Sequence, residues 1–239
     1  MKKRIIVIIC IVLTVAAAAG LIFGISSCVK SRKEAAESER LMREYVENKK
    51  AIYAEENAAG GDFEVIFLGD SLTDGYDIAK YYGEYRASNR GIGGDTTSGL
   101  IERLQVSAYD AHPQVIVLLI GGNDILGGKS IESVCENYEK IITGIRQNLP
   151  DTKIVWCSLS PLGSDWAKHN KTVVRCNEMI RQLAEKYGCA FVDIYTPLCD
   201  PNTQRICDEY TVEGVHFTDA GYRVVSAAVK KALREALGH

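Results

Sequence analysis

The sequence predicts a three-layer α/β fold in which helices cover both faces of a parallel sheet. From Phe63 onward, apolar segments of strand length alternate with longer helical patterns, and this alternation is typical of βαβ units. The run Val115–Ile120 is apolar at every position, as a strand covered on both faces requires. With 46% hydrophobic and 25% charged residues among 239, the chain is neither collagen-like, low-complexity nor fully disordered.

Five strands and three long helices are expected in the body of the chain. The strands are predicted at Glu64–Leu68, Ala87–Gly91, Gln114–Ile120, Lys153–Ser158 and Cys189–Ile194. The helices are predicted at Ser130–Asn148, Lys168–Tyr187 and Ala220–Leu237. In the first helix, apolar residues recur at helical spacing and mark one buried face: Ile131, Val134, Tyr138, Ile141, Ile142 and Ile145.

The first thirty residues have a different character. The segment Ile5–Ile25 is almost wholly apolar and follows three basic residues; it is long enough to span ~30 Å of hydrocarbon as a helix. Residues 1–30 are therefore predicted to be a single-pass transmembrane signal anchor, with the domain on the extracytoplasmic face of the cell membrane. An alternative is a lipoprotein signal that ends before Cys28, because Ile25-Ser26-Ser27-Cys28 resembles a bacterial lipobox.

Charge and composition divide the remaining chain. Residues 31–62 are rich in Glu, Lys and Ala and are predicted to form a charged stalk or linker helix that ends at Ala58-Ala59-Gly60-Gly61. Residues 63–239 then form one domain. Residues 1–33 contain six basic and no acidic residues, so 22 basic and 31 acidic residues give the remaining chain a net charge of −9. This charge argues against nucleic acid as a partner.

The cysteines allow two interpretations. Six of the eight lie in residues 63–239, and none belongs to a C-x-x-C pair, so neither a metal site nor a redox motif is expected. They are either small buried residues or, in an extracytoplasmic domain, disulfide partners, with Cys199 and Cys207 the plausible pair. No cofactor is expected.

Polar clusters follow the predicted strands, at the carboxyl ends where the functional residues of a parallel sheet gather. They are Gly69-Asp70-Ser71-Leu72, Gly93-Gly94-Asp95-Thr96, Gly121-Gly122-Asn123-Asp124 and Glu213-Gly214-Val215-His216. Because the carboxyl ends of parallel strands meet at one edge, these clusters are expected to form one site. The opposite edge carries nothing comparable.

The residue types in these clusters suit acyl transfer. Of the four histidines, only His216 lies in a loop at this edge, so it is the candidate general base. Ser71, between a strand end and a helix start, is the candidate nucleophile, although a serine at that position can also be a helix N-cap. The N–H groups of Ser71 and Gly94 and the side-chain amide of Asn123 could form an oxyanion hole.

These four blocks resemble the four motifs of the SGNH (GDSL) hydrolases, a family that includes bacterial esterases and lysophospholipases. The resemblance covers about residues 63–239 and implies a flavodoxin-like fold with strand order 2-1-3-4-5. It implies that Ser71 is the nucleophile, that Gly94 and Asn123 are oxyanion donors and that His216 is the base. The family usually has Asp three residues before the His, where this chain has Glu213. Glu213 is therefore the expected triad acid, with Asp208 and Glu209 as alternatives.

The expected activity is that of a serine esterase that hydrolyses O-acyl or O-acetyl esters of a carbohydrate, such as a cell-wall glycan, or of a lipid. Gly69-Asp70-Ser71-Leu72-Thr73 lacks the second glycine of a G-x-S-x-G elbow, which excludes the α/β-hydrolase fold. Two alternatives remain: a flavodoxin-like ligand-binding module with residues 93–98 as an anion nest, and an anchored SGNH domain without catalysis.

Overall fold

The computed structural model describes the backbone of residues 2–238 and the side chains of residues 28–238. Its centre is a five-stranded sheet in the order β2-β1-β3-β4-β5. The strands are β1 (Val65–Gly69), β2 (Ala87–Gly91), β3 (Val115–Leu119), β4 (Lys153–Cys157) and β5 (Ala190–Val192). All neighbouring strands run parallel. The flavodoxin-like order implied by the family resemblance is therefore confirmed.

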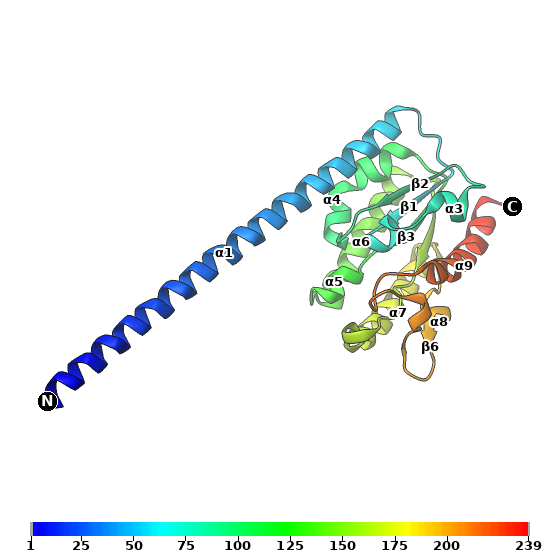
Figure 1. The fold of residues 1–239 in the computed structure, drawn as a ribbon. Coiled ribbons are helices and arrows are strands. Elements are labelled where there is room, and N and C mark those ends of the chain that lie inside the picture. Colours follow the sequence, from blue (N-terminus) through cyan, green and yellow to red (C-terminus); the bar gives the residue numbers. More distant parts are fainter. Residues whose placement is uncertain (1, 239) are drawn as a thin grey trace. The chain divides into compact units, whose positions relative to one another are not determined.

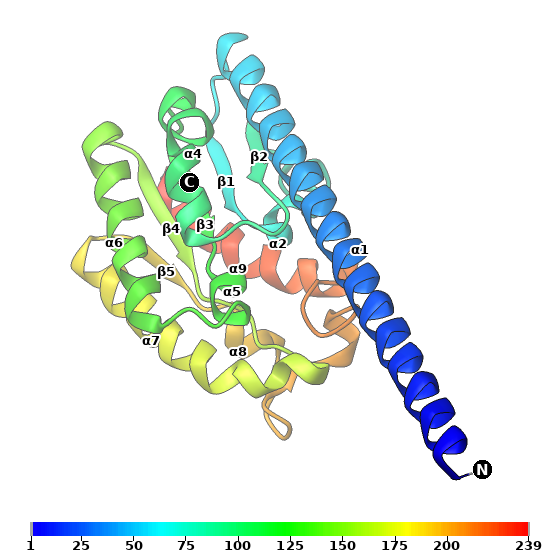
Figure 2. The same ribbon diagram turned by 90° about the vertical axis from the view of Figure 1, so that its left-hand side faces the viewer.

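Helices cover both faces of the sheet, as Figures 1 and 2 show. On one face lie α4 (Thr97–Ser107), α6 (Ile131–Asn148) and α7 (Asn170–Lys186), with α6 in contact with both of the others. On the other face α9 (Asp219–Leu237) packs against β3, β4 and β5. This is the three-layer arrangement that the alternating pattern predicts.

Several shorter elements connect these layers. The short helices are α2 (Ser71–Asp74), α3 (Ile78–Tyr82), α5 (Gly122–Leu126) and α8 (Tyr195–Leu198). Single turns of 3-10 helix are η1 (Tyr109–Ala111), η2 (Ser164–His169) and η3 (Asp208–Tyr210). The strands β6 (Cys199–Asp200) and β7 (Arg205–Ile206) form a small antiparallel pair.

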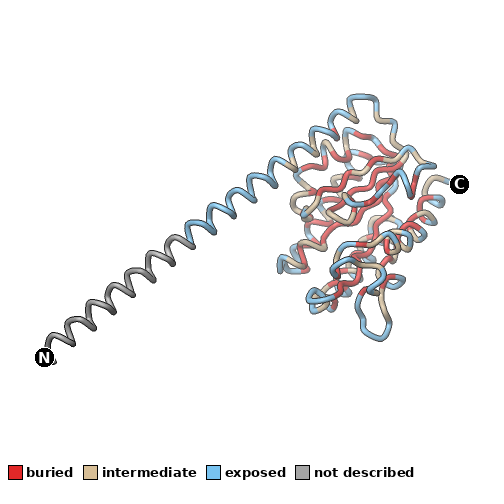
Figure 3. The backbone as a smooth tube through the Cα atoms, viewed as in Figure 1, coloured by how far each residue is buried: buried red, intermediate tan, exposed pale blue. Residues whose placement is uncertain are grey.

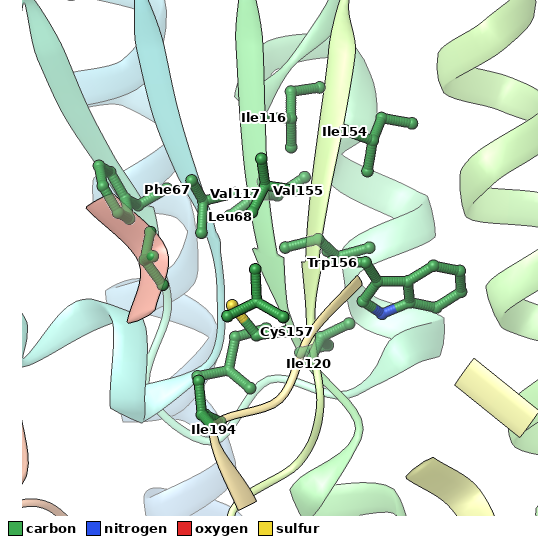
Figure 4. Close-up of a cluster of buried hydrophobic side chains, with 14 of the residues drawn as sticks. Phe67, Leu68, Ile116, Val117, Ile120, Ile154, Val155, Trp156, Cys157 and Ile194 are labelled. Carbon is green, nitrogen blue, oxygen red and sulfur yellow. The ribbon is translucent and has the colours of Figure 1, made fainter. Parts of the chain in front are cut away.

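The core lies on both faces of the central strands. Every residue of β1 and β3 is buried, and the sheet stands out as the buried part of the tube in Figure 3. Because successive side chains of a strand point to opposite faces, Trp156 and Cys157 of β4 enter different halves of the core (Figure 4). Trp156 lies edge-on to Tyr138 of α6, with ring centroids 5.1 Å apart. Both layers of helices are thus held to the sheet by apolar packing.

The predicted strands and long helices are all present, with ends that differ by at most two residues, and the strand Ala87–Gly91 has the predicted ends. The helix α4 was not expected, because its buried face carries the polar residues Thr97, Arg103 and Ser107 beside two leucines. Polar residues at buried positions interrupt the apolar periodicity from which a helix is predicted. Their hydrogen bonds, which only the folded chain provides, make this face stable when buried.

The thiols in the described part of the chain are not paired. Cys135, Cys157 and Cys176 are buried free thiols, as the interpretation as small buried residues expects, whereas Cys189, Cys199 and Cys207 are only partly buried. Burial raises the pKa of Cys157 to about 12. Cys199 and Cys207 are also free, and in the β6–β7 register Cys199 stands opposite Ile206. The disulfide considered for them is therefore absent.

The chain divides into two compact units, residues 1–48 and 49–239. Helix α1 spans Lys2–Ala58, so its last turns belong to the second unit. That unit begins earlier than the boundary expected at residue 63, because the end of the stalk packs on it. The Tyr53 side chain is 1% exposed, and Asn57 Nδ2 donates a hydrogen bond to the Val106 carbonyl over 2.8 Å.

The predicted membrane anchor, residues 1–30 with its apolar core Ile5–Ile25, lies almost entirely outside the residues whose side chains are described. Within the part that is described, no helix combines the length and the apolar character that crossing a bilayer requires.

Candidate active site

The carboxyl ends of the strands bring the predicted site residues to one edge of the sheet. Strand β1 leads through Asp70 into α2, whose first residue is Ser71. Strand β3 leads into α5, which carries Asn123. The N-cap of α2 is Asp70, whose carboxylate accepts the Leu72 N–H over 3.1 Å. Ser71 is therefore not the helix cap, and its hydroxyl is available for another role.

Ser71, His216 and Glu213 form one hydrogen-bonded chain. The Nε2 atom of His216 lies 3.0 Å from Ser71 Oγ, although the two residues are 145 positions apart in the sequence. On the other side of the ring, Nδ1 contacts the Glu213 carboxylate. The Oε1 atom of Glu213 also accepts the main-chain N–H of His216 over 3.1 Å. An imidazole held in this way has Nδ1 as donor and Nε2 as acceptor towards the serine hydroxyl.

The two other acids considered for this role lie in η3, before the His216 loop. No hydrogen bond joins Asp208 or Glu209 to His216 among the described residues. The main-chain carbonyl of Glu209 instead accepts a hydrogen bond from Thr218 Oγ1 over 2.6 Å. The local backbone brings Glu213 to the imidazole, so the extra methylene of Glu relative to Asp is accommodated within the loop.

Gly94 and Asn123 are connected through Asp95. The Asp95 N–H donates to the Ile92 carbonyl over 3.2 Å, which closes a turn with Gly94 at its third position and a φ of 76°. A positive φ at this position of a turn favours glycine. Asn123 Nδ2 donates to the Asp95 carbonyl over 2.8 Å. An amide nitrogen has two hydrogens, so Nδ2 can hold this turn and still donate to a substrate oxygen.

A small cavity opens beside Ser71. Its volume is about 30 Å³. Its polar lining includes Ser71, Asn123 and Asp70, whereas Gly94 lies in the adjacent turn and does not line it. The apolar part of the lining is Leu72, Leu119, Leu126, Leu159, Leu162, Val173 and Val215. Leu72 and Val215 belong to the sequence clusters, but none of these apolar residues was predicted to line a cavity, because in the one-dimensional pattern they resemble any other core residue.

Buried carboxylates surround this edge. Asp70 is 4% exposed, and burial, with the nearby Asp95 and Asp124 as smaller contributors, raises its pKa to about 7. Burial also raises the pKa of Asp95. Asp124 is fully buried and accepts the Thr97 N–H and hydroxyl, each over 2.8 Å. Asp124 thus ties the start of α4 to α5, the helix that carries Asn123.

Arg103 is another residue at this edge whose role the sequence did not indicate. It is 3% exposed, and its guanidinium donates to three segments of the site. Nε donates to Asp95 Oδ2 over 2.7 Å, Nη1 to the Arg90 carbonyl over 2.9 Å and Nη2 to the Gly69 carbonyl over 2.8 Å. An arginine inside α4 has no distinctive sequence neighbourhood, so only the folded chain reveals this role.

The edge brings together a serine hydroxyl, an imidazole, a carboxylate behind the imidazole and amide donors nearby, which is the arrangement of groups that a serine hydrolase uses. The described residues contain no cluster of three or more His, Cys, Asp or Glu that could hold a metal ion.

Comparison with known proteins agrees with this geometry. The family model described as the GDSL-like lipase/acylhydrolase family matches residues 67–224. A Drosophila melanogaster protein, the platelet-activating factor acetylhydrolase IB subunit beta homolog, is 33% identical over 129 residues, which are 52% of this chain. The match spans 56% of that relative, so the chain covers about half of its length.

Solved structures have the same fold. A protein from Streptococcus pneumonia, whose description names platelet activating factor, superimposes with a TM-score of 0.78 and 28% identity over 83% of this chain and 97% of its own. A GDSL-like lipase from Bacteroides thetaiotaomicron superimposes with a TM-score of 0.71 and 24% identity over 78% of this chain and 98% of its own. The family model covers more than half of the chain, and this chain therefore belongs to the GDSL-like lipase/acylhydrolase family, a family of enzymes that hydrolyse esters.

Proposed function

We propose that this protein is a serine esterase that removes short acyl groups, acetyl in particular, from a carbohydrate or lipid alcohol. The observation that carries the proposal is the chain of contacts from Glu213 through His216 to Ser71 at the mouth of a small apolar cavity. A flavodoxin-like binding module has no use for an imidazole held between a carboxylate and a serine hydroxyl.

In the acylation step, Ser71 Oγ attacks the ester carbonyl carbon while His216 Nε2 accepts the hydroxyl proton. The 3.0 Å separation of the two atoms is within the range for direct proton transfer. Glu213 orients the ring and stabilises the imidazolium that forms. The negative charge on the former carbonyl oxygen is stabilised by the N–H groups of Ser71 and Gly94 and by the Asn123 amide.

Collapse of this tetrahedral intermediate breaks the bond to the alcohol oxygen, which takes its proton from the His216 imidazolium. The acyl group remains on Ser71 Oγ. Water then attacks the acyl carbon while His216 Nε2 accepts a proton from it, and the same donors stabilise the second intermediate. Collapse of the second intermediate breaks the bond between the acyl carbon and Ser71 Oγ, which takes its proton back from the His216 imidazolium, and the carboxylic acid leaves the free enzyme.

The cavity supports a short acyl group. A space of about 30 Å³ holds about two water-sized groups, which is the size of an acetyl group. Its leucine and valine lining suits the methyl end of that group. The Drosophila relative is described as an acetylhydrolase, which agrees with a short acyl group.

We also propose that the apolar run Ile5–Ile25 anchors the enzyme in the cell membrane, with the hydrolase domain on the extracytoplasmic face. The support is the length and composition of this run and the three basic residues that precede it. The lipoprotein alternative at Cys28 makes a different prediction, since it requires cleavage before Cys28. The mass of the mature N-terminus distinguishes the two.

A chain-length series tests the esterase proposal. The full-length protein is assayed on p-nitrophenyl acetate, butyrate and octanoate, together with an acetylated sugar and a lysolipid, beside Ser71→Ala. We expect Ser71-dependent turnover that is fastest with acetate and falls steeply by octanoate. Equal rates for wild type and Ser71→Ala would refute the enzyme and favour a non-catalytic binding domain. Faster turnover of octanoate than of acetate would refute the short acyl group alone.

A further inference from the structure

The last turns of α1 contact the strand from which the Gly94 turn departs. The Tyr53 hydroxyl donates a hydrogen bond of 2.6 Å to the carbonyl of Gly91, the last residue of β2. The Tyr53 ring is itself fixed by packing, because the Arg90 guanidinium lies 4.7 Å from its centroid. The hydroxyl is therefore presented to Gly91 from a buried and immobilised side chain.

The hydrogen bond from Tyr53 fixes one side of a single peptide group. In the Gly91–Ile92 peptide, the carbonyl accepts from Tyr53, and the N–H donates to the Gly69 carbonyl over 3.1 Å. The next carbonyl, that of Ile92, accepts from Asp95 and closes the turn that contains Gly94. This peptide therefore anchors the start of the turn that carries the Gly94 N–H.

A second residue of α1, one turn earlier, contacts the helix that begins with Ser71. Lys49 Nζ forms an ion pair of 2.6 Å with Oδ1 of Asp74, the last residue of α2. Both side chains are largely shielded, at 22% and 26% exposure, which reduces the screening of this pair by solvent. The end of β2 lies against the same helix, because a Cβ on Gly91 would collide with the Asp74 main-chain nitrogen.

We infer that Tyr53 and Lys49 are positioning residues for ester hydrolysis. Tyr53 holds the peptide that anchors the turn with Gly94, and Lys49 holds the helix that carries Ser71. The inference rests on the proposed function, because it takes Ser71 as nucleophile and Gly94 as oxyanion donor. Neither side chain touches the substrate; each acts through the backbone that it holds. The end of α1, which the sequence assigns to a linker, is thereby part of the catalytic unit.

The substitution Tyr53→Phe tests this role, because it keeps the ring against Arg90 and removes only the hydroxyl. A small displacement of a catalytic group costs about 10- to 100-fold in rate, so we expect kcat on p-nitrophenyl acetate to fall about tenfold. KM and the pH profile of kcat should stay unchanged, because His216 keeps its partners. Lys49→Met should lower kcat in the same way, and Lys49→Arg should restore most of it.

The matched control is Tyr109→Phe, which removes the hydroxyl of a partly buried tyrosine in η1, before β3. It should leave kcat unchanged. A double-mutant cycle then asks whether Tyr53 acts through Gly94. Gly94→Ala strains a residue with a φ of 76° and displaces its N–H, so adding Tyr53→Phe to it should cause little further loss. Losses that multiply in the double variant would overturn the proposed route.

The outcomes separate this inference from the function on which it rests. Absence of Ser71-dependent turnover in the wild type would overturn both. An active wild type with an unchanged kcat in Tyr53→Phe would overturn only the positioning role. The positioning role would also be overturned if Tyr109→Phe lowered kcat as much as Tyr53→Phe does. The same holds if the loss of kcat disappeared once rates were divided by the folded fraction measured in thermal unfolding.

Discussion

Asp70 should make the folded protein less stable as the pH rises through neutrality. Its carboxyl is 4% exposed, and burial raises its pKa from 3.8 to about 7. In the folded chain the protonated form is therefore favoured, relative to the unfolded chain, by about 4 kcal/mol. The unfolded chain loses this proton at a lower pH than the folded chain. The contribution of Asp70 to the free energy of unfolding is therefore complete below about pH 4 and is lost as the pH rises to about 7.

The substitution Asp70→Asn removes this titration with little change in shape. The asparagine side-chain oxygen can still accept the Leu72 N–H that caps α2. The free energy of unfolding of Asp70→Asn minus that of the wild type should therefore increase by about 4 kcal/mol between about pH 3 and about pH 8. Urea unfolding followed by circular dichroism at a series of pH values measures this difference.

The control is Asp77→Asn, at the N-cap of α3. Asp77 accepts the Lys80 N–H over 3.0 Å, so its capping role is like that of Asp70, but its side chain is exposed. Asp77→Asn therefore measures, at an exposed position, the effect of replacing a capping carboxylate by an amide, and the Asp70→Asn difference is compared with it at each pH. If the Asp70→Asn difference were independent of pH, or if it decreased as the pH rose, the argument that burial keeps Asp70 protonated would be wrong.

Two further predictions concern the proposed catalytic groups. Glu213→Gln should lower kcat by up to about 10⁴-fold, because the amide no longer favours the imidazole form with its proton on Nδ1; steady-state kinetics measure this, and Asp208→Asn should remain close to wild type. A loss in Asp208→Asn with a silent Glu213→Gln would assign the acid to η3 instead. Asn123→Ala should lower kcat by about 10²–10³ without loss of the fold, and an unchanged kcat would show that Asn123 only holds Asp95.

The carboxyl-edge clusters show how much of the site can be predicted from the sequence. Ser71, Asn123 and His216 each lie directly beside a strand end or a helix start, so topology alone brings them to one edge. Topology does not determine which of Glu213, Asp208 and Glu209 contacts His216. All three lie within eight residues of His216, and only the backbone path of the loop determines which carboxylate reaches Nδ1.

The fold class follows from apolar periodicity. A strand covered on both faces needs apolar residues at every position, and a helix covered on one face needs them at helical spacing, whichever elements pack against it. Alternation from Phe63 onward therefore determined the parallel sheet, and the four glycine-rich blocks determined the family. The tertiary structure alone decided the elements whose stability depends on specific partners. The face of α4 with Arg103 can be buried because carbonyls of β1 and β2 and the Asp95 carboxylate accept its hydrogen bonds. Tyr53 packs on the domain because Arg90 lies against its ring and the Gly91 carbonyl lies opposite its hydroxyl. Such polar contacts join residues far apart in the chain, and no local pattern records them.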